Sequence, residues 1–158
     1  MFKRKLDYII DIETINCYAP QWGMDDWQKA IFNIGITAVE RISRKKVFQA
    51  QYGIDKVWSV PKRFIMDFYR KNFVRSEFDR MFETFKEFTE WFNESTKELA
   101  KEYDIEFWSY NAMFDSDGFR INAEREKVKL TKLTDDWSYY GISLCVLLQV
   151  SLYKTNHL

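Results

Sequence analysis

Hydrophobic and polar positions alternate along the first third of the chain. In the part that comes next, hydrophobic residues recur with the spacing of helices. An apolar run at 8–14 carries acidic residues at its end, and two further apolar or alternating runs lie at 30–39 and 46–54. These runs have the length and pattern of β-strands, and the polar turn at 41–45 is typical of a hairpin. The pattern predicts a three-strand antiparallel meander with a loop at 16–27 between its first two strands.

Apolar residues then recur at three- and four-residue steps, which predicts helices. One helix is expected over 60–73, with Pro61 near its first turn. A second helix is expected to begin after Ser76, a residue type that favours the N-cap position. It carries a stripe that we expect to pack against the sheet, made of Phe78, Met81, Phe82, Phe85, Phe88 and Phe92.

The remaining sequence predicts one more strand and further helical structure. Residues 105–110 have a strand pattern that ends at Asn111-Ala112, and a helix is expected to begin at Phe114-Asp115. The apolar segment at 142–153 is compatible with a buried helix or a buried strand. The predicted fold class is therefore α/β, a mixed sheet with helices packed on it, formed by a single domain over residues 1–158.

Composition and charge narrow the functional classes. Hydrophobic residues make up 46% and aromatic residues 18% of the chain, which indicates a globular domain and excludes a disordered one. The formal net charge is zero, so a polyanion would have to be held by a local basic patch or by a metal. No apolar stretch approaches the length of a membrane span, and we expect no membrane partner. Cys17 and Cys145 lack a CxxC or Cys/His partner, which favours free thiols and a cytoplasmic location.

Candidate chemistry lies at the end of the first predicted strand. Alternate side chains of a strand point to the same face, so Asp11 and Glu13 would stand about 6 to 7 Å apart at their Cα atoms. Two neighbouring carboxylates repel each other unless a cation or a proton offsets the repulsion, and Mg²⁺ and Mn²⁺ prefer such oxygen ligands. The pair also fits a strand whose polar end reaches water at a sheet edge.

Two motifs add a family resemblance. Asp-Ile-Glu-Thr at 11–14, followed by Phe-Asn-Ile-Gly at 32–35, resembles the first motif region of the DEDD 3′–5′ exonucleases. The stretch 108–115 resembles the second motif, in which an Asn, a small residue and a variable one precede Phe-Asp. The likeness spans about residues 7–125 and is strongest to compact bacterial and phage 3′–5′ exoribonucleases. It implies a ribonuclease H-like fold with three meander strands and further parallel strands.

The resemblance also implies a two-metal site. Asp11 would bridge two Mg²⁺ or Mn²⁺ ions, and Glu13 would hold the ion that activates the attacking water. Asp115 would support the second ion and its waters, although alone it would also fit a helix N-cap. The expected reaction releases nucleoside 5′-monophosphates from the ends of single-stranded RNA or DNA, with RNA favoured.

Several residues are expected to bind the terminal nucleotide. The resemblance places the backbone around Thr14 at this position, together with Asn111 and Phe114 of the second motif. Aromatic side chains stack on the bases of single strands, and Trp22, Trp27 and Phe114 are the candidates. Each of these aromatic residues also fits a place in the core.

The third motif of the family is incomplete in this chain. That motif pairs a His or Tyr base with an Asp four or five residues later. His157 is the only histidine and is the candidate base, but the sequence given ends at Leu158; Tyr153 is followed four residues later by His157. One explanation is a lost C-terminal helix, whose uncovered apolar face a homodimer would bury. The other is a diverged member that takes its fourth carboxylate from Asp135, Asp136 or a partner.

These departures keep two other functions open. One is a catalytically weak or truncated nuclease-fold module that binds nucleic acid or a protein partner. The other is a structural or interaction protein in which the acidic pair is a coincidence.

Overall fold

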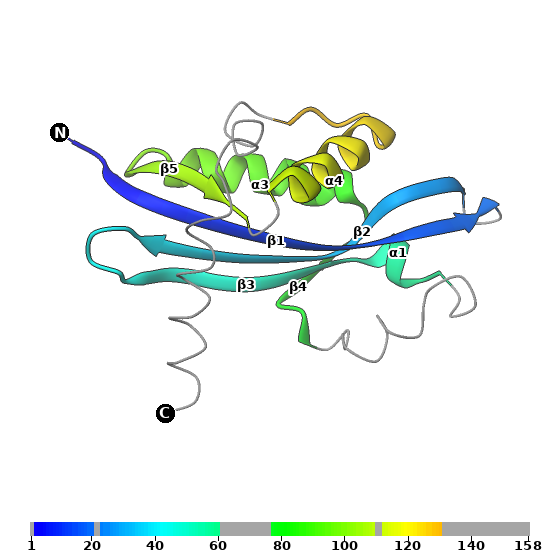
Figure 1. Cartoon of the computed structure of the whole chain (residues 1–158), viewed down its shortest axis with the longest axis horizontal. Helices are drawn as coiled ribbons and strands as arrows, with labels where there is room; N and C mark the ends of the chain where they lie inside the picture. The colour runs from blue at the N-terminus through cyan, green and yellow to red at the C-terminus, as the bar shows by residue number, and fades with distance from the viewer. Residues whose placement is uncertain (1, 21–22, 61–76, 110–111, 131–158) are drawn as a thin grey trace.

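The chain adopts an α/β fold in which five strands form one mixed sheet flanked by helices (Figure 1). The structure is a computed structural model that describes residues 2–20, 23–60, 77–109 and 112–130. The strands are β1 (Arg4–Ala19), β2 (Met24–Glu40), β3 (Lys46–Ile54), β4 (Arg80–Phe82) and β5 (Tyr103–Trp108). The helices are α1 (Asp55–Trp58), α3 (Phe85–Leu99) and α4 (Ala112–Arg125).

The sheet combines an antiparallel meander with parallel strands. Its strand order is β4-β3-β2-β1-β5, in which β1, β2 and β3 pair antiparallel. Parallel pairs join β1 to β5 and β3 to β4. The predicted meander is confirmed, and so is the α/β class. Over the part of the chain described, no helix is long and apolar enough to cross a membrane.

Strand β1 presents different chemistry on its two faces. Leu6, Tyr8, Ile10 and Ile12 are buried, and Tyr8 contacts Phe92 of α3 with ring centroids 5.7 Å apart. Helices α3 and α4 lie together on this face of the sheet (Figure 1). Because side chains alternate along a strand, the odd-numbered residues from Asp7 to Glu13 point to the opposite face. The predicted acidic pair therefore lies on the face that α3 and α4 do not cover.

The phenylalanine stripe forms the core, as predicted, but α3 begins later than expected. Phe85, Phe88 and Phe92 are at most 1% exposed and lie on α3. The Thr84 side chain is the N-cap and accepts a hydrogen bond from the Glu87 N–H, at 3.2 Å. The predicted start after Ser76 is therefore wrong for this helix: Phe82 belongs to β4, and Phe78 precedes that strand. The sequence Thr-x-x-Glu at 84–87 carries the capping signal that fixes the boundary.

Other predicted boundaries were also wrong or lie outside the described part. The expected loop at 16–27 is largely strand, because β1 and β2 remain paired up to Ala19 and Met24. The helix expected at 114–115 is confirmed as α4. Almost all of the helix predicted at 60–73, and the whole segment at 142–153, lie outside the described residues.

Helix α4 approaches β1 closely through a glycine. A Cβ atom placed on Gly118 would lie 2.4 Å from Cδ1 of Ile12, much closer than two carbon atoms can pack. Ile12 is 4% exposed, so its side chain has little room to move away. Gly118 thus sets the distance between the helix and the strand that carries Asp11 and Glu13.

We predict that Gly118→Ala destabilises the protein by about 1 kcal/mol, because overpacking exceeds the gain in helix propensity. Ile12→Val removes the atom that the new Cβ would meet, and alone it costs about 1 kcal/mol. The double variant should be more stable than the sum of the two single effects predicts, by about 1 kcal/mol in urea unfolding. Additive effects would show that Gly118 is not a packing contact of Ile12.

Candidate functional site

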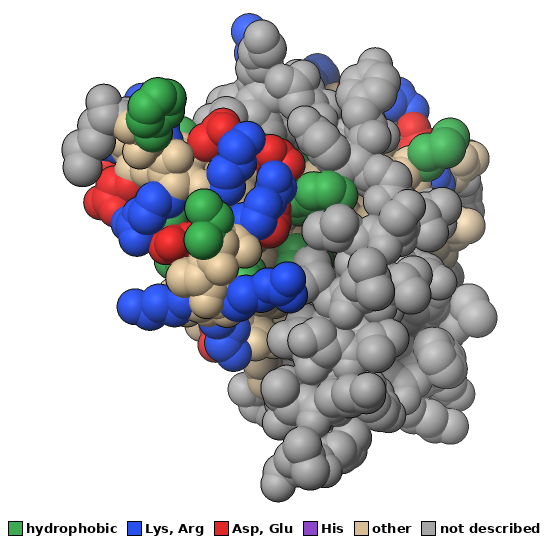
Figure 2. All heavy atoms as spheres, turned by 60° about the vertical axis from the view of Figure 1, so that its left-hand side comes forward, with side chains coloured by type: hydrophobic (Ala, Val, Ile, Leu, Met, Phe, Trp, Pro, Cys, Tyr) green, Lys and Arg blue, Asp and Glu red, His purple; other side chains and the backbone are tan. Residues whose placement is uncertain are grey.

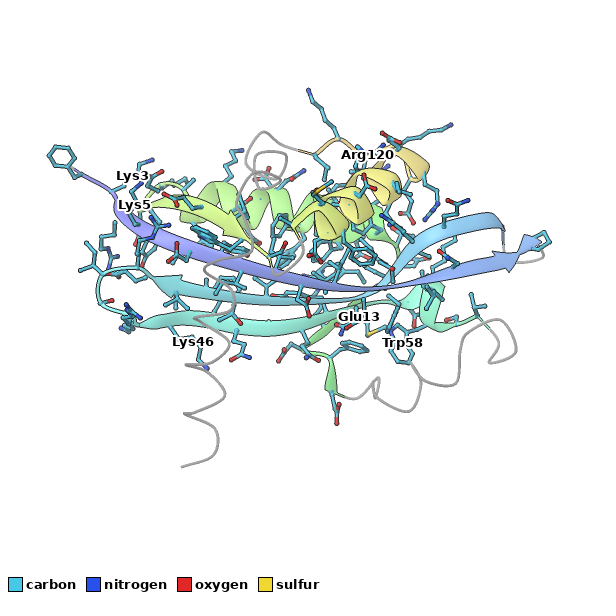
Figure 3. The ribbon with its side chains drawn as sticks, in the orientation of Figure 1. Lys3, Lys5, Glu13, Lys46, Trp58 and Arg120 are labelled. Atoms are coloured by element: carbon cyan, nitrogen blue, oxygen red, sulfur yellow. The ribbon has the colours of Figure 1, made fainter. Side chains whose placement is uncertain are left out.

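The two carboxylates of the first motif stand on the uncovered face of β1. Asp11 pairs with Gly35 of β2, and Glu13 pairs with Asn33. Gly35 has no side chain that could cover the neighbouring Asp11 carboxylate, which is exposed. Glu13 is half-buried and points away from α3 and α4 (Figure 3).

This pair is electrostatically unfavourable when both groups are ionised. Partial burial raises the pKa of the Asp11 carboxyl, although water still reaches this exposed side chain and limits the effect. Burial also raises the pKa of Glu13, and the charge of Asp11 raises it further. Among the described residues, no Lys, Arg or His forms an ion pair with either carboxylate. A bound cation would therefore lower the energy of the ionised pair.

A third carboxylate on the same face of β1 is fully compensated. Asp7 is 5% exposed and accepts hydrogen bonds from Arg41 Nε at 3.0 Å and Trp108 Nε1 at 2.9 Å. Arg41 also donates to Glu106 of β5, and its hydrogen bond lowers the pKa of Glu106. Because Arg41 pairs with Asp7 and Glu106, its charge does not neutralise Asp11 or Glu13.

Asp115 reaches the same stretch of β1 from α4. It lies in the first turn of the helix, is 2% exposed, and its Oδ1 accepts a hydrogen bond from the Ile12 N–H at 3.2 Å. The parallel pairing of β1 with β5 ends at Ile9 and Trp108. The Asp115 carboxylate thus takes the place of a strand partner, between the backbones of Asp11 and Glu13. Because α4 begins at Ala112, Asp115 lies inside the helix and is not its N-cap residue.

Of the other predicted site residues, the structure describes some and leaves others outside the described residues. Thr14 follows Glu13 at a break in the register of β1 and β2. The Phe114 ring lies under Lys29, with Nζ 5.0 Å from its centroid. The part of the chain that the structure describes contains no cluster of three or more His, Cys, Asp or Glu that could hold a metal. Asn111, Trp22 and His157 lie outside that part, and so does the side chain of Trp27.

Asn33 is a site residue to which the sequence assigned no role. It is 5% exposed, it is the strand partner of Glu13, and its Oδ1 accepts no hydrogen bond from the described residues. Phe32, the residue before it, is an extra residue in the β2 ladder, and its carbonyl accepts a hydrogen bond from Trp58 Nε1 at 3.0 Å. Such bulges redirect side chains beside functional sites. The only sequence signal for this residue was the motif Phe-Asn-Ile-Gly at 32–35, and that motif did not distinguish Asn33 from its neighbours.

Comparison of the sequence with protein-family models gives no match, and comparison with curated proteins gives none either. The functional interpretation therefore depends on the residues of the site and on their geometry.

We predict that Asp11→Asn raises the thermal unfolding midpoint at pH 7 without divalent cations, by up to about 2 °C. A carboxyl group whose pKa is raised by folding favours the folded state when protonated, and this contribution is lost as the pH rises through its folded pKa. The gain should therefore be larger at pH 7 than at pH 4. Thermal melts between pH 4 and 8 in EDTA measure it.

Glu106→Gln provides a control, because it should change the unfolding midpoint in the opposite direction. Because Arg41 lowers the pKa of Glu106 below 4.5, its ionised form stabilises the fold above that pH and loses the effect as the pH falls through the folded pKa. Glu106→Gln should lower the midpoint at pH 7, and the difference should shrink towards pH 3. A lowered midpoint for Asp11→Asn at pH 7 would mean that Asp11 is a stabilising structural carboxylate.

Proposed function

We propose that this protein is a metal-dependent 3′–5′ exonuclease that acts on single-stranded RNA or DNA, with RNA favoured. The observation that carries the proposal is the uncompensated pair Asp11 and Glu13, with Asp115 bound to the backbone N–H between them. On the same strand, the Asp7 carboxylate has an arginine partner. A neutralising ligand is therefore expected at the pair and not at Asp7.

The donor set fits a hard divalent cation in part. Asp11 and Glu13 supply carboxylate oxygens on one face, and these are the ligands that Mg²⁺ and Mn²⁺ prefer. Asp115 would support a second ion through its waters. When bound, such ions supply a hydroxide-like nucleophile near neutral pH and stabilise the leaving oxygen of a phosphodiester. The fourth carboxylate and the base are expected from outside the described residues, with His157 as the candidate base.

The protein's own contribution would be positioning. The Ile12 N–H holds the Asp115 carboxylate in one orientation, and α4 is fixed against β1 by the close contact at Gly118. Gly35, the strand partner of Asp11, carries no side chain that a phosphodiester would have to pass. Thr14 of the first motif and Phe114 of the second motif would meet the terminal nucleotide.

The topology also supports a ribonuclease H-like arrangement. The resemblance implies a meander that begins with the strand of the acidic pair, followed by a parallel strand and a helix that carries the third acid. In this chain, β5 lies parallel to β1 and α4 carries Asp115. This order brings two motifs about a hundred residues apart to one place on the sheet.

We predict that the protein shortens a 5′-labelled single-stranded RNA from its 3′ end with Mn²⁺, and that Asp11→Ala reduces the rate by about 100-fold or more. Because removal of the Asp11 charge should not destabilise the fold, this loss would not reflect unfolding. Glu94→Ala, which removes an exposed carboxylate from α3, should retain wild-type activity. A ladder of products in EDTA, or one retained by Asp11→Ala, would exclude the proposed mechanism.

Metal-linked stability gives a second test that does not need activity. Mn²⁺ should raise the unfolding midpoint of the wild type with increasing concentration, and the increase should be lost in Asp11→Ala. Stabilisation without degradation, in a folded wild-type protein, would favour the catalytically weak module. Oligonucleotide binding that survives both EDTA and Asp11→Ala would favour the same alternative. Absence of metal-linked stabilisation would favour a coincidental acidic pair.

A further inference from the structure

Basic residues from two distant segments meet at one end of the sheet. The β2–β3 turn is held beside the start of β1, because the Arg41 N–H donates to the Lys5 carbonyl at 3.0 Å. Within the turn, the Arg44 N–H donates to the Glu40 carbonyl at 2.9 Å, and Arg44 has a φ of 59°. We call this region the basic end; its cations are Lys3, Arg4, Lys5, Arg41, Arg44, Lys45 and Lys46. Lys3, Lys5 and Lys46 are seen at this end in Figure 3.

Several of these cations have no acidic partner. Arg4 pairs with Glu40 and Lys5 with Asp104, whereas four others form no ion pair with a described residue. These four are Lys3, Arg44, Lys45 and Lys46, and all are exposed. Lys3 Nζ donates to the Ala100 carbonyl, and Lys46 Nζ donates to Gln49 Oε1 at 3.0 Å. In a chain of zero net charge, the basic end is therefore a local site where a polyanion can bind.

Apolar side chains are exposed among these cations. Phe2 is fully exposed and Ile42 is 86% exposed. An open hollow of about 450 Å³ lies beside Phe2, and Lys3, Lys5 and Tyr103 contribute to its lining. Figure 2 shows this side of the molecule, where Lys and Arg side chains alternate with hydrophobic and acidic ones. Aromatic rings beside phosphate-binding cations are the arrangement by which proteins hold single-stranded nucleic acid.

We propose that the basic end binds the sugar-phosphate backbone of a single strand upstream of the 3′ end that is being processed. This inference rests on the proposed function. Both sites are built on β1 and β2: Asp11 lies five residues from Leu6, the strand partner of Glu40. That separation is about 17 Å along the strand, so a bound strand must be several nucleotides long to reach both sites.

The arrangement of charges favours a nucleic acid strand over an anionic membrane. Glu40, Asp104 and Glu106 lie among the cations and would repel a flat anionic surface. A flexible single strand can instead place its phosphates on the cations and its bases against Phe2 and the hollow.

The test is the binding of the full chain to a 5′-fluorescein-labelled 20-residue oligouridine, measured by fluorescence anisotropy in EDTA. The triple variant Arg44→Gln/Lys45→Gln/Lys46→Gln removes cations without breaking a described ion pair. Its affinity at low salt should fall about tenfold or more, and the slope of log K against log salt should decrease by about 2, since each single-strand contact contributes roughly 0.7. The matched control, Lys86→Gln/Lys97→Gln/Lys129→Gln, carries the same charge change elsewhere and should bind like the wild type.

Equal effects of the two triple variants would overturn the proposal, because binding would then reflect net charge alone. A second outcome would also overturn the proposal and assign the basic end to a membrane. In that outcome the wild type binds vesicles of phosphatidylserine and phosphatidylcholine, the triple variant at 44–46 does not, and no form binds oligouridine. The binding assay contains no metal and uses no activity. Its outcome therefore stands whether or not the protein proves to be a nuclease.

Where degradation is observed, substrate length provides a second readout. The triple variant Arg44→Gln/Lys45→Gln/Lys46→Gln should retain the wild-type rate on a dinucleotide, which is too short to reach the basic end. Its KM for the 20-residue strand should rise about tenfold. A rise of the same size for the dinucleotide would overturn the proposal, because the hairpin would then act at the catalytic site itself.

Discussion

The hydrogen bond from the Ile12 N–H to the Asp115 carboxylate is the contact on which the arrangement of the site depends. Strand β5 stops pairing with β1 at Trp108, and from that point the first turn of α4 occupies the edge of β1. The close approach at Gly118 then fixes the helix along its length. The Asp115 carboxylate is buried, and the hydrogen bond from Ile12 offsets part of its desolvation cost, so the bond and the packing stabilise each other.

The uncovered face of β1 shows how one strand can carry carboxylates in different electrostatic surroundings. The Asp7 carboxylate accepts hydrogen bonds from Arg41 and from the Trp108 indole. Asp11 and Glu13, a few residues further along, point to the same face without an ion-pair partner among the described residues, and they oppose folding when ionised. Uncompensated charge of this kind is typical of sites that are completed by a ligand. It is also why we place the function at this end of the strand.

The sequence allowed the meander, the shared face of Asp11 and Glu13 and the helix that carries Asp115 to be predicted, because each depends on local pattern or on a motif. It did not allow the start of α3 to be predicted. Phe78 and Phe82 match the helical spacing of the stripe, and only the cap at Thr84 separates a strand from the helix. The loop expected at 16–27 was wrong because cross-strand pairing overrides the turn-forming residues of that stretch.

Contacts between distant residues were beyond prediction from one sequence. The pairing of Arg41 with Asp7 and Glu106 depends on the register of three strands, and no local pattern encodes it. The same is true of Asn33, whose place beside Glu13 follows from the register of β1 against β2. Local spacing thus indicated which residues carry the chemistry, while the tertiary structure determined which of their charges are compensated.

The pairing of β1 with β2 also sets a rule for how this protein can change during evolution. Regular pairing of β1 with β2, from Leu6 and Glu40 to Glu13 and Asn33, connects the basic end to the carboxylate pair. A single inserted residue between Leu6 and Asp11, if no bulge absorbed it, would turn every later side chain to the opposite face and bury the acids beneath α3 and α4. Paired insertions of two residues in both strands would preserve the faces, and each would lengthen the separation by about 7 Å. Homologues with a different separation between the basic end and the carboxylate pair would therefore differ in steps of two residues per strand, or in the length of the β2–β3 turn.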